Sequence, residues 1–329
     1  MQEAQKLGIS DVDSHDIFIG NGVSELIIMT AQGLIDEGDE VLVPAPDYPL
    51  WSAALNLAGA KVVYYHCDEA NNWYPDINDI RRKVTRCTKA ILVINPNNPT
   101  GAVYSDGLLS EISDVARDHG LMIFADEIYD KLLFDDAKHT SIASLQSDVL
   151  CITYNGLSKA YRGAGFRCGW ATISGPKALK KEAREAFELL SNMRLCANTT
   201  AQLAVQTALG GTQSIKELVA ADSRLTKQRN LAVDVLSSIP GVNVVKPQGG
   251  LYIFFSLCAK MYPIESDTRF VLDFLLEEKV LIVQGSGFHF SGNQHFRMVF
   301  LAHSEELKEA IRRLQSFLQR YHLSALNKV

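Results

Sequence analysis

The sequence predicts an α/β fold, with a mostly parallel sheet in a large domain followed by a smaller C-terminal α/β domain. Short apolar runs alternate with amphipathic helical stretches through the first two thirds of the chain. These runs are almost continuously apolar, which indicates strands that are buried on both faces. A βαβ rhythm of this kind is typical of a parallel sheet covered by helices. The pattern changes after about residue 175, where a block of helices precedes a second set of short strands.

The expected strands of the large domain are short and rich in Val, Ile, Leu and aromatic residues. They cover residues 41–45, 61–66, 89–95, 121–127, 149–155 and 169–174, and each closes on Pro, Asn, Asp or Gly. One helix is expected over 24–35, ending near Gly38. Another is expected over 105–119, where Ser105 offers an N-terminal cap and Gly120 a C-terminal one.

The rest of the chain predicts more helices and a second sheet. Helices are expected from 176 past 191, over 199–209 and over 212–238, and later over 267–278 and 304–321. Strands are expected over 242–246, 251–257, 280–284 and 295–301. We place the domain boundary inside the 212–238 helix, which gives a large domain of residues 1–225 and a small domain of residues 226–329.

Composition narrows the possible functions of this 329-residue chain. Its 32 Lys and Arg against 38 Asp and Glu give a net charge of −6, which disfavours a general nucleic-acid or membrane-surface binder. No apolar run is long enough to span a bilayer, and the first residues lack the apolar core of a signal peptide, so we expect a cytoplasmic protein. The six scattered cysteines predict reduced, mostly buried thiols, and their spacing from the histidines predicts no metal site.

Candidate site residues follow the expected strands, because ligands of open parallel sheets bind beyond the carboxyl ends of the strands. The small residues of segment 20–25 precede a helix and suit a phosphate. A dinucleotide fingerprint fails there, because Glu25 stands where the third glycine belongs. Taken alone, the segment is an ordinary helix start capped by Ser24.

Two further segments carry polar groups at strand ends. Asn98 offers an amide within the Pro-containing segment 95–101, which composition alone would make a tight turn. Asp126 closes an apolar run, so its carboxylate is expected to be partly buried and in need of a partner. The alternative for Asp126 is a helix N-cap. Tyr129 lies three residues further along.

The cationic candidates are Lys159, Arg167 and Arg297. Lys159 follows a strand in a turn with Arg167 nearby, where a lysine can become a nucleophile for carbonyls; the alternative is a solvated lysine. Arg297 lies among apolar residues, which favours forked binding of a carboxylate or phosphate, or else a structural ion pair. A cationic anchor, a carboxylate, a phosphate cradle and a Schiff-base lysine together are what pyridoxal 5'-phosphate requires.

In these motifs the chain resembles the class I aminotransferases of the fold-type-I pyridoxal-phosphate enzymes. The resemblance covers essentially the whole chain. Within the class, the chain is most similar to the bacterial glutamate–pyruvate (alanine) aminotransferases. The motifs that carry it are NPNNPTG (95–101), ADEIY (125–129), NGLSK (155–159), GFRCGW (165–170) and HFR (295–297), with GNGVSELI, PAPDYPLW, ADEIYDKLL and MRLCAN for the bacterial group.

The resemblance implies roles around the cofactor ring. Lys159 would hold the cofactor and then act as the general acid–base. Asp126 would pair with the ring nitrogen and keep it protonated. Asn98 and Tyr129 would hydrogen-bond the ring's 3′ oxygen, and Tyr48 would stack on the ring face.

It also implies roles for binding the phosphate and the substrate. Val23 and Ser24 would bind the phosphate through their N–H groups, joined by Arg167, with Gly22 shaping the turn. Arg297 would clamp the α-carboxylate of the substrate and help to close the small domain, and Asn98 would also contact the substrate. Many relatives carry a Ser where this chain has Gly156, so no phosphate role is assigned there and Ser158 is kept as a candidate.

The function implied is transamination between an L-amino acid and a 2-oxo acid by a homodimer, with alanine and 2-oxoglutarate as the expected pair. Two alternatives stay open, a β-lyase that uses the same lysine and a non-catalytic module that keeps the cofactor pocket. The second alternative arises because relatives have a longer segment before the 20–25 turn. That segment supplies a dimer arm, a glycine loop and a tyrosine for the partner's phosphate, which we expect this chain to lack.

Overall fold

The computed structural model describes residues 1–326 and contains an eight-stranded sheet in order β1-β8-β7-β6-β5-β2-β3-β4. Strands β3, β2, β5, β6 and β7 run parallel, whereas β8 is antiparallel to both β7 and β1, and β4 is antiparallel to β3. The strands are β1 (Ile17–Gly20), β2 (Glu40–Ala45), β3 (Lys61–Asp68), β4 (Tyr74–Pro75), β5 (Thr88–Ile94), β6 (Met122–Asp126), β7 (Cys151–Gly156) and β8 (Gly169–Ser174). The mostly parallel sheet predicted from the sequence is confirmed.

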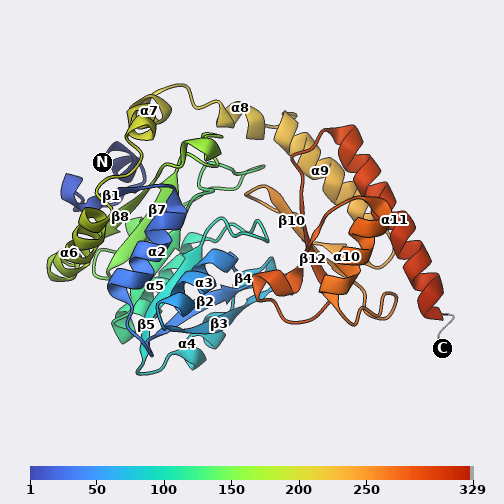
Figure 1. Ribbon diagram of the computed structural model, residues 1–329, viewed down its shortest axis with the longest axis horizontal. Helices are drawn as coiled ribbons and strands as arrows, with labels where there is room; N and C mark the ends of the chain where they lie inside the picture. Colours follow the sequence, from blue (N-terminus) through green and yellow to red (C-terminus); the bar gives the residue numbers. More distant parts are fainter. Residues whose placement is uncertain (327–329) are drawn as a thin grey trace.

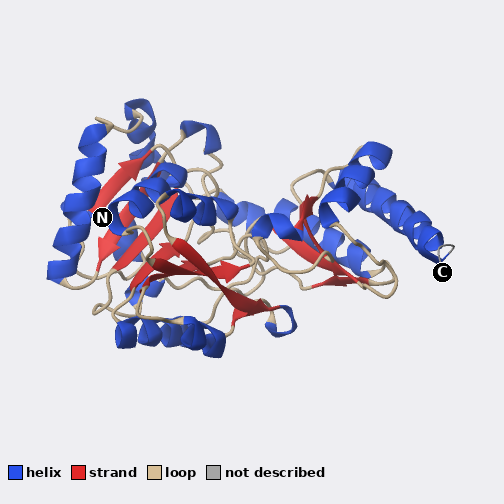
Figure 2. Ribbon diagram, turned by 60° about the horizontal axis from the view of Figure 1, so that its bottom comes forward, coloured by secondary structure: helices blue, strands red, loops and turns tan. Residues whose placement is uncertain are grey.

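Helices cover both faces of this sheet (Figures 1 and 2). On β5, Ile91 and Val93 pack in the core that includes residues of α4 and α5, whereas Leu92 and Ile94 pack in the core that includes α2, α3 and α6. Burial on both faces is why the strands carry continuous apolar runs. The helices are α1 (Gln2–Lys6), α2 (Val23–Leu34), α3 (Pro49–Leu57), α4 (Ile77–Lys83), α5 (Asp106–His119), α6 (Lys177–Met193) and α7 (Thr199–Gly210).

A four-stranded antiparallel sheet in order β11-β12-β10-β9 forms the smaller part of the fold (Figure 1). Its strands and helices are α8 (Ile215–Val219), α9 (Arg224–Ser237), β9 (Val242–Val244), β10 (Tyr252–Leu257), α10 (Asp267–Glu278), β11 (Val283–Gln284), β12 (His295–Val299) and α11 (Ser304–Leu326). Five short 3-10 turns complete the described elements: η1 (Ser14–Asp16), η2 (Glu69–Asn71), η3 (Ile142–Ser144), η4 (Ala164–Phe166) and η5 (Gly285–Phe288).

The cap residues expected for α5 are confirmed. The side chain of Ser105 accepts a hydrogen bond from the backbone N–H of Leu108 at 3.4 Å, and Gly120 ends the helix in the left-handed conformation with φ 64°. Caps are local signals, so the sequence alone predicts them.

Several expected elements differ in the structure. The single helix expected over 212–238 is wrong: α8 ends at Val219 and α9 begins at Arg224. Between them Asp222 adopts a positive φ of 61°, and the Ser223 hydroxyl donates to the carbonyl of Ala220 at 2.6 Å, which closes a turn. The expected strand over 280–284 shortens to Val283–Gln284, the two residues that pair with β12. The domain boundary at residue 225 stays a prediction.

The expectation that the cysteines are mostly buried is only partly right. All six are free thiols, with Cys87 and Cys196 exposed and Cys258 partly buried. Cys67, Cys151 and Cys168 are buried, as expected for residues that fill a core. Among the described helices, none combines the length and apolar character needed to cross a membrane.

Candidate active site

A cavity of about 330 Å³ lies between the carboxyl ends of the parallel strands and the smaller sheet. It is lined by every site residue predicted from the sequence except Gly22. These are Val23, Ser24, Tyr48, Asn98, Asp126, Tyr129, Ser158, Lys159, Arg167 and Arg297. The residues come from segments far apart in the chain. The strand order of the large sheet brings most of them to one edge, and β12 of the smaller sheet contributes Arg297.

Asp126 ends β6 and is only 3% exposed. The indole Nε1 of Trp51 donates to its Oδ2 at 3.0 Å, and the backbone N–H of Ile128 donates to its Oδ1 at 3.3 Å. Among the described residues it has no ion-pair partner, and burial raises the pKa of its carboxyl group. A buried carboxylate that borders a cavity in this way suits a ligand that brings a positive charge.

Lys159 lies in the turn after β7, with its side chain at the cavity. Its Nζ lies 5.6 Å from the centre of the Tyr129 ring and hydrogen-bonds to none of the described residues. The amine is therefore open to a ligand in the cavity, which is what a covalent role requires.

Arg297, in β12, contributes a second cation. Its Nη1 donates to Oδ1 of Asn98 at 3.1 Å. The central carbon of its guanidinium lies 4.2 Å from the centre of the Tyr252 ring and 4.6 Å from the centre of the Phe288 ring. Its Nε is buried without a partner, and burial lowers the pKa of the guanidinium. A partly buried arginine that meets no carboxylate among the described residues is prepared for an anionic ligand, because two N–H groups of its fork can bind a carboxylate.

The turn before α2 supplies an anion-binding helix end. Gly22 has φ 80°, and a Cβ at this position would collide with the guanidinium of Arg167. Val23 and Ser24 begin the helix, where backbone N–H groups lack partners within the helix. Arg167 donates to the carbonyls of Ala164 (3.0 Å) and Asn21 (3.4 Å) and makes no ion pair with a described residue. The arrangement suits a phosphate.

Three aromatic residues of the site were not predicted from the sequence. Trp51 is fully buried and orients Asp126, Tyr252 contacts both Arg297 and the Tyr129 hydroxyl (3.2 Å), and Phe288 also contacts the Arg297 guanidinium. Trp51 and Tyr252 lie in stretches typical of ordinary apolar core, whereas Phe288 lies in the Gly-containing turn η5. Trp51 follows Pro49 closely in PAPDYPLW, a segment already marked by Tyr48, and this was the one available signal.

Gly156 has a steric reason to lack a side chain. A Cβ there would lie 2.8 Å from the Cys168 carbonyl oxygen and 2.9 Å from the Gly169 Cα, because β7 and β8 approach closely. A side chain at this position therefore has no room unless the strands shift, whereas Ser158 lines the cavity.

Comparison with known proteins identifies the family. The aminotransferase class I and II family profile matches residues 4–314. The chain belongs to this family. It is 55% identical over 322 residues to the glutamate-pyruvate aminotransferase AlaA of Escherichia coli K12, covering 98% of this chain and 80% of that protein. It is 54% identical over 314 residues to the alanine aminotransferase of Mycobacterium tuberculosis H37Rv, covering 95% of this chain and 73% of that protein.

Solved structures agree with this assignment. An aminotransferase from Escherichia coli superposes with a TM-score of 0.96 at 55% identity, over 98% of this chain and 80% of that one. The alanine aminotransferase of Pyrococcus furiosus superposes with a TM-score of 0.92 at 40% identity, over 97% of this chain and 80% of that one. The fold-type-I aminotransferase architecture predicted from the sequence is therefore confirmed.

Class I and II aminotransferases use pyridoxal 5'-phosphate, and this aminotransferase depends on the same cofactor. The described residues fit it. Asp126 forms no ion pair with a described residue, and neither do Lys159, Arg167 and Arg297, which border the same cavity. A cofactor with a ring nitrogen and a phosphate, together with a substrate carboxylate, provides the charges that these four side chains lack.

Proposed function

We propose that this aminotransferase transfers the amino group of L-alanine to 2-oxoglutarate, giving pyruvate and L-glutamate. Relatives that share 54–55% of its residues carry the names glutamate-pyruvate and alanine aminotransferase. The observation that carries the proposal is the single cavity that gathers Lys159, Asp126 and Arg297. The transfer proceeds in two halves, so both the amino acid and the oxo acid occupy the same site in turn.

Arg297 binds the α-carboxylate that both substrates share. The rings of Tyr252 and Phe288 restrain the guanidinium, and Asn98 accepts one of its N–H groups at 3.1 Å. The remaining N–H groups, including the unpartnered Nε, are available to the carboxylate. Because the site restrains the guanidinium before substrate arrives, little conformational entropy is lost on binding.

Lys159 first holds the cofactor and afterwards moves a proton at the α-carbon of the substrate. When bound, pyridoxal phosphate supplies the electron sink that makes this α-proton acidic. Asp126 stabilises positive charge at the ring nitrogen, and Trp51 keeps its Oδ2 oriented. The Tyr129 hydroxyl, at 3.2 Å from that of Tyr252, and the Asn98 amide would hold the ring oxygen of the cofactor, and Tyr48 would contact the ring.

The phosphate is held at the start of α2. The N–H groups of Val23 and Ser24 would bind it, and Arg167 and the Ser158 hydroxyl would contribute further donors, while Gly22 leaves room for the arginine. These contacts fix the cofactor while Lys159 is free for proton transfer.

The test is a single half-reaction. The enzyme loaded with pyridoxal phosphate is mixed with L-alanine alone, and the absorbance of the cofactor is followed together with pyruvate release. Conversion to the amine form with equimolar pyruvate supports the proposal. Catalytic pyruvate release from cystathionine without an oxo acid would instead indicate a β-lyase, and no spectral change with alanine would indicate a binding module.

The role of Lys159 has its own test. Borohydride reduction should fix the cofactor to the enzyme, and Lys159→Ala should abolish that adduct. Peptide mapping that finds the adduct on another lysine would defeat the assignment.

We also propose a homodimer. The apolar side chains of Leu189, Met193, Leu195 and Leu203 on α6, α7 and the segment between them are 64–85% exposed, and partner burial would remove them from water. Native sizing and sedimentation test this, with a monomer as the contradicting result. The free thiols support the proposed location in the reducing cytoplasm, which fractionation would test.

A further inference from the structure

The turn that carries Lys159 is fastened at its base by backbone hydrogen bonds. The N–H of Leu157 donates to the Cys168 carbonyl at 2.9 Å, and the N–H of Gly163 donates to the Leu157 carbonyl at 2.8 Å. These contacts hold the ends of the turn. These two bonds do not fix the central residues, Lys159 to Tyr161, in the position from which Lys159 reaches the cavity.

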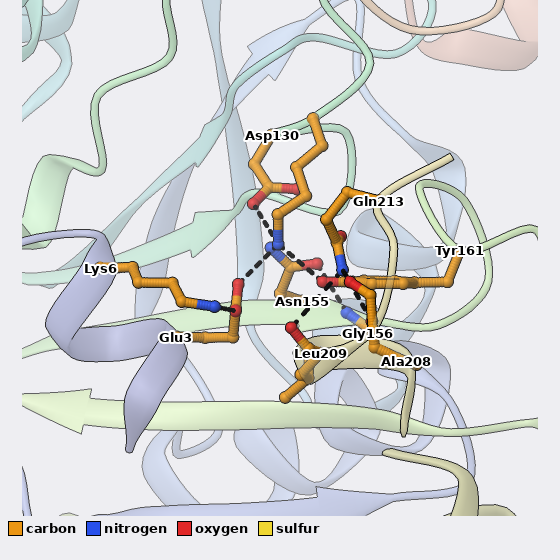
Figure 3. Close-up of polar contacts among 11 residues, drawn as sticks. Glu3, Lys6, Asp130, Asn155, Gly156, Tyr161, Ala208, Leu209 and Gln213 are labelled. Carbon is orange, nitrogen blue, oxygen red and sulfur yellow. Dashed lines mark hydrogen bonds and ion pairs between the residues drawn. The ribbon is translucent and has the colours of Figure 1, made fainter. Parts of the chain in front are cut away.

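A polar cluster behind the turn holds the centre. Lys131 Nζ donates to the hydroxyl of Tyr161 at 2.7 Å and to Oε2 of Glu3 at 2.6 Å, and it lies 3.7 Å from Oδ2 of Asp130. Figure 3 shows Glu3, Asp130 and Tyr161 converging from three separate segments of the chain. Tyr161 lies two residues after Lys159, and Lys131 lies five residues after Asp126.

The charges in this cluster make Lys131 hard to replace. Asp130 is 5% exposed, and Lys131 is the one cation that pairs with it among the described residues. Glu3 is 8% exposed and is shared between Lys131 and Lys6. These partners raise the pKa of Lys131, which keeps it charged throughout the working range of the enzyme.

Lys6 offers a natural comparison, because it pairs with the same Glu3. Its Nζ donates to Oε1 of Glu3 at 2.9 Å, yet its side chain is 61% exposed. No described contact joins it to Tyr161. A contribution that merely anchors α1 would be shared by both lysines, whereas a contribution to the turn belongs to Lys131 alone.

We propose that Lys131 is a positioning residue for the reaction, which acts through Tyr161 to hold Lys159 in the cavity. The proposal rests on the proposed role of Lys159. Lys131 does not line the cavity, so it acts only through the turn. A small displacement of that turn costs rate, because proton transfer requires Lys159 at a fixed place beside the reacting atom.

The experiment compares Lys131→Met, Tyr161→Phe and Lys6→Met in the enzyme loaded with pyridoxal phosphate. Rates are normalised to bound cofactor, and visible circular dichroism reports how the cofactor is held. Lys131→Met should lower kcat by about ten- to a hundred-fold, with KM for alanine changed by less than about two-fold, and should weaken the visible dichroic band. Lys131→Arg should recover much of kcat, since it restores a cation with several donors.

The control variants make the result decisive. Tyr161→Phe, which keeps the aromatic ring and removes only its hydroxyl, should change kcat and the dichroic band in the same direction as Lys131→Met. Lys6→Met should leave both unchanged. Equal effects of Lys131→Met and Lys6→Met, or an unchanged kcat and band in Lys131→Met, would overturn the proposal. If Lys159→Ala still forms a borohydride adduct, the proposed role of Lys159 is wrong. If Lys159→Ala loses the adduct while Lys131→Met keeps the kcat and dichroic band of the parent, only the positioning proposal is wrong.

Discussion

Replacing Arg297 by leucine separates the cost of a missing substrate contact from the cost of a disturbed fold. In the described structure the guanidinium is partly buried, with one hydrogen bond to Asn98, two aromatic neighbours and no carboxylate. We expect Arg297→Leu to raise KM for L-alanine and for 2-oxoglutarate alike, because both substrates present the same α-carboxylate to this residue.

The size of the effect follows from the burial of the site. Truncating one partner of a buried, hydrogen-bonded charge pair costs about 2–5 kcal/mol. At about 1.36 kcal/mol for each factor of ten, kcat/KM should fall by about 30- to 5,000-fold. Steady-state assays with each substrate varied in turn measure this loss.

Stability should respond far less than activity. Leucine removes a buried cation whose pKa is already lowered by burial, which favours the folded protein. It also removes two ring contacts of about 0.5–2 kcal/mol each, which opposes that gain. We therefore expect the thermal midpoint of unfolding to change by less than about 4 °C.

Arg229 in α9 is the matched control. It is fully buried, but it donates to Oδ1 of Asp135 at 2.8 Å and to the Pro247 carbonyl at 3.2 Å, outside the cavity. Arg229→Leu should lower the thermal midpoint while leaving KM unchanged. Unchanged KM values in Arg297→Leu, or unfolding of that variant to the extent seen with Arg229→Leu, would refute the reasoning.

Three further predictions concern charge, backbone and thiols. Burial raises the pKa of Glu127 well above its usual 4.5, so the folded protein keeps a proton that the unfolded chain releases. The parent protein therefore loses stability as pH rises toward the folded pKa, whereas glutamine does not titrate. The unfolding free energy of Glu127→Gln, measured by urea unfolding, should increase relative to that of the parent between about pH 4 and pH 8. Gly22→Ala should raise the Kd for pyridoxal phosphate, because the new Cβ displaces Arg167 and the backbone conformation costs about 1–3 kcal/mol; equal cofactor affinity would contradict this. A thiol reagent should modify the exposed Cys87 and Cys196 in the folded protein. It should modify Cys67 and Cys151 only after unfolding, because burial raises the pKa of these two thiols. Mass spectrometry measures the modification, and prompt reaction of either buried thiol would contradict the prediction.

Local signals explain how much of the fold could be predicted. The runs that became β5, β6 and β7 are buried on both faces, so their apolar residues are continuous and easy to recognise. The cap residues of α5 act on neighbouring backbone groups and were predicted for the same reason. The break between α8 and α9 was missed, because Asp and Ser, the residue types at 222 and 223, also occur inside helices. The turn at these two residues, seen only in the structure, separates the two helices.

The site divides in the same way. Asp126 and Lys159 could be predicted because each directly follows an apolar run, and strand ends of parallel sheets meet at one edge. Tyr252 could not, because its role depends on the antiparallel pairing of β10 with β12, which brings it near Arg297. The contact between Lys131 and Tyr161 likewise joins two loops whose proximity no local pattern encodes.

By itself, the sequence determined the class of fold, the aminotransferase family and the chemical groups that surround the cavity, because strand periodicity and the motifs are written in contiguous residues. Only the tertiary structure decided which charges have partners. Arg229 meets Asp135 and is neutralised, while Arg297 meets two aromatic rings and remains available to a ligand. Charge pairing depends on distance in space, and distance in space is set by packing between residues far apart in the chain.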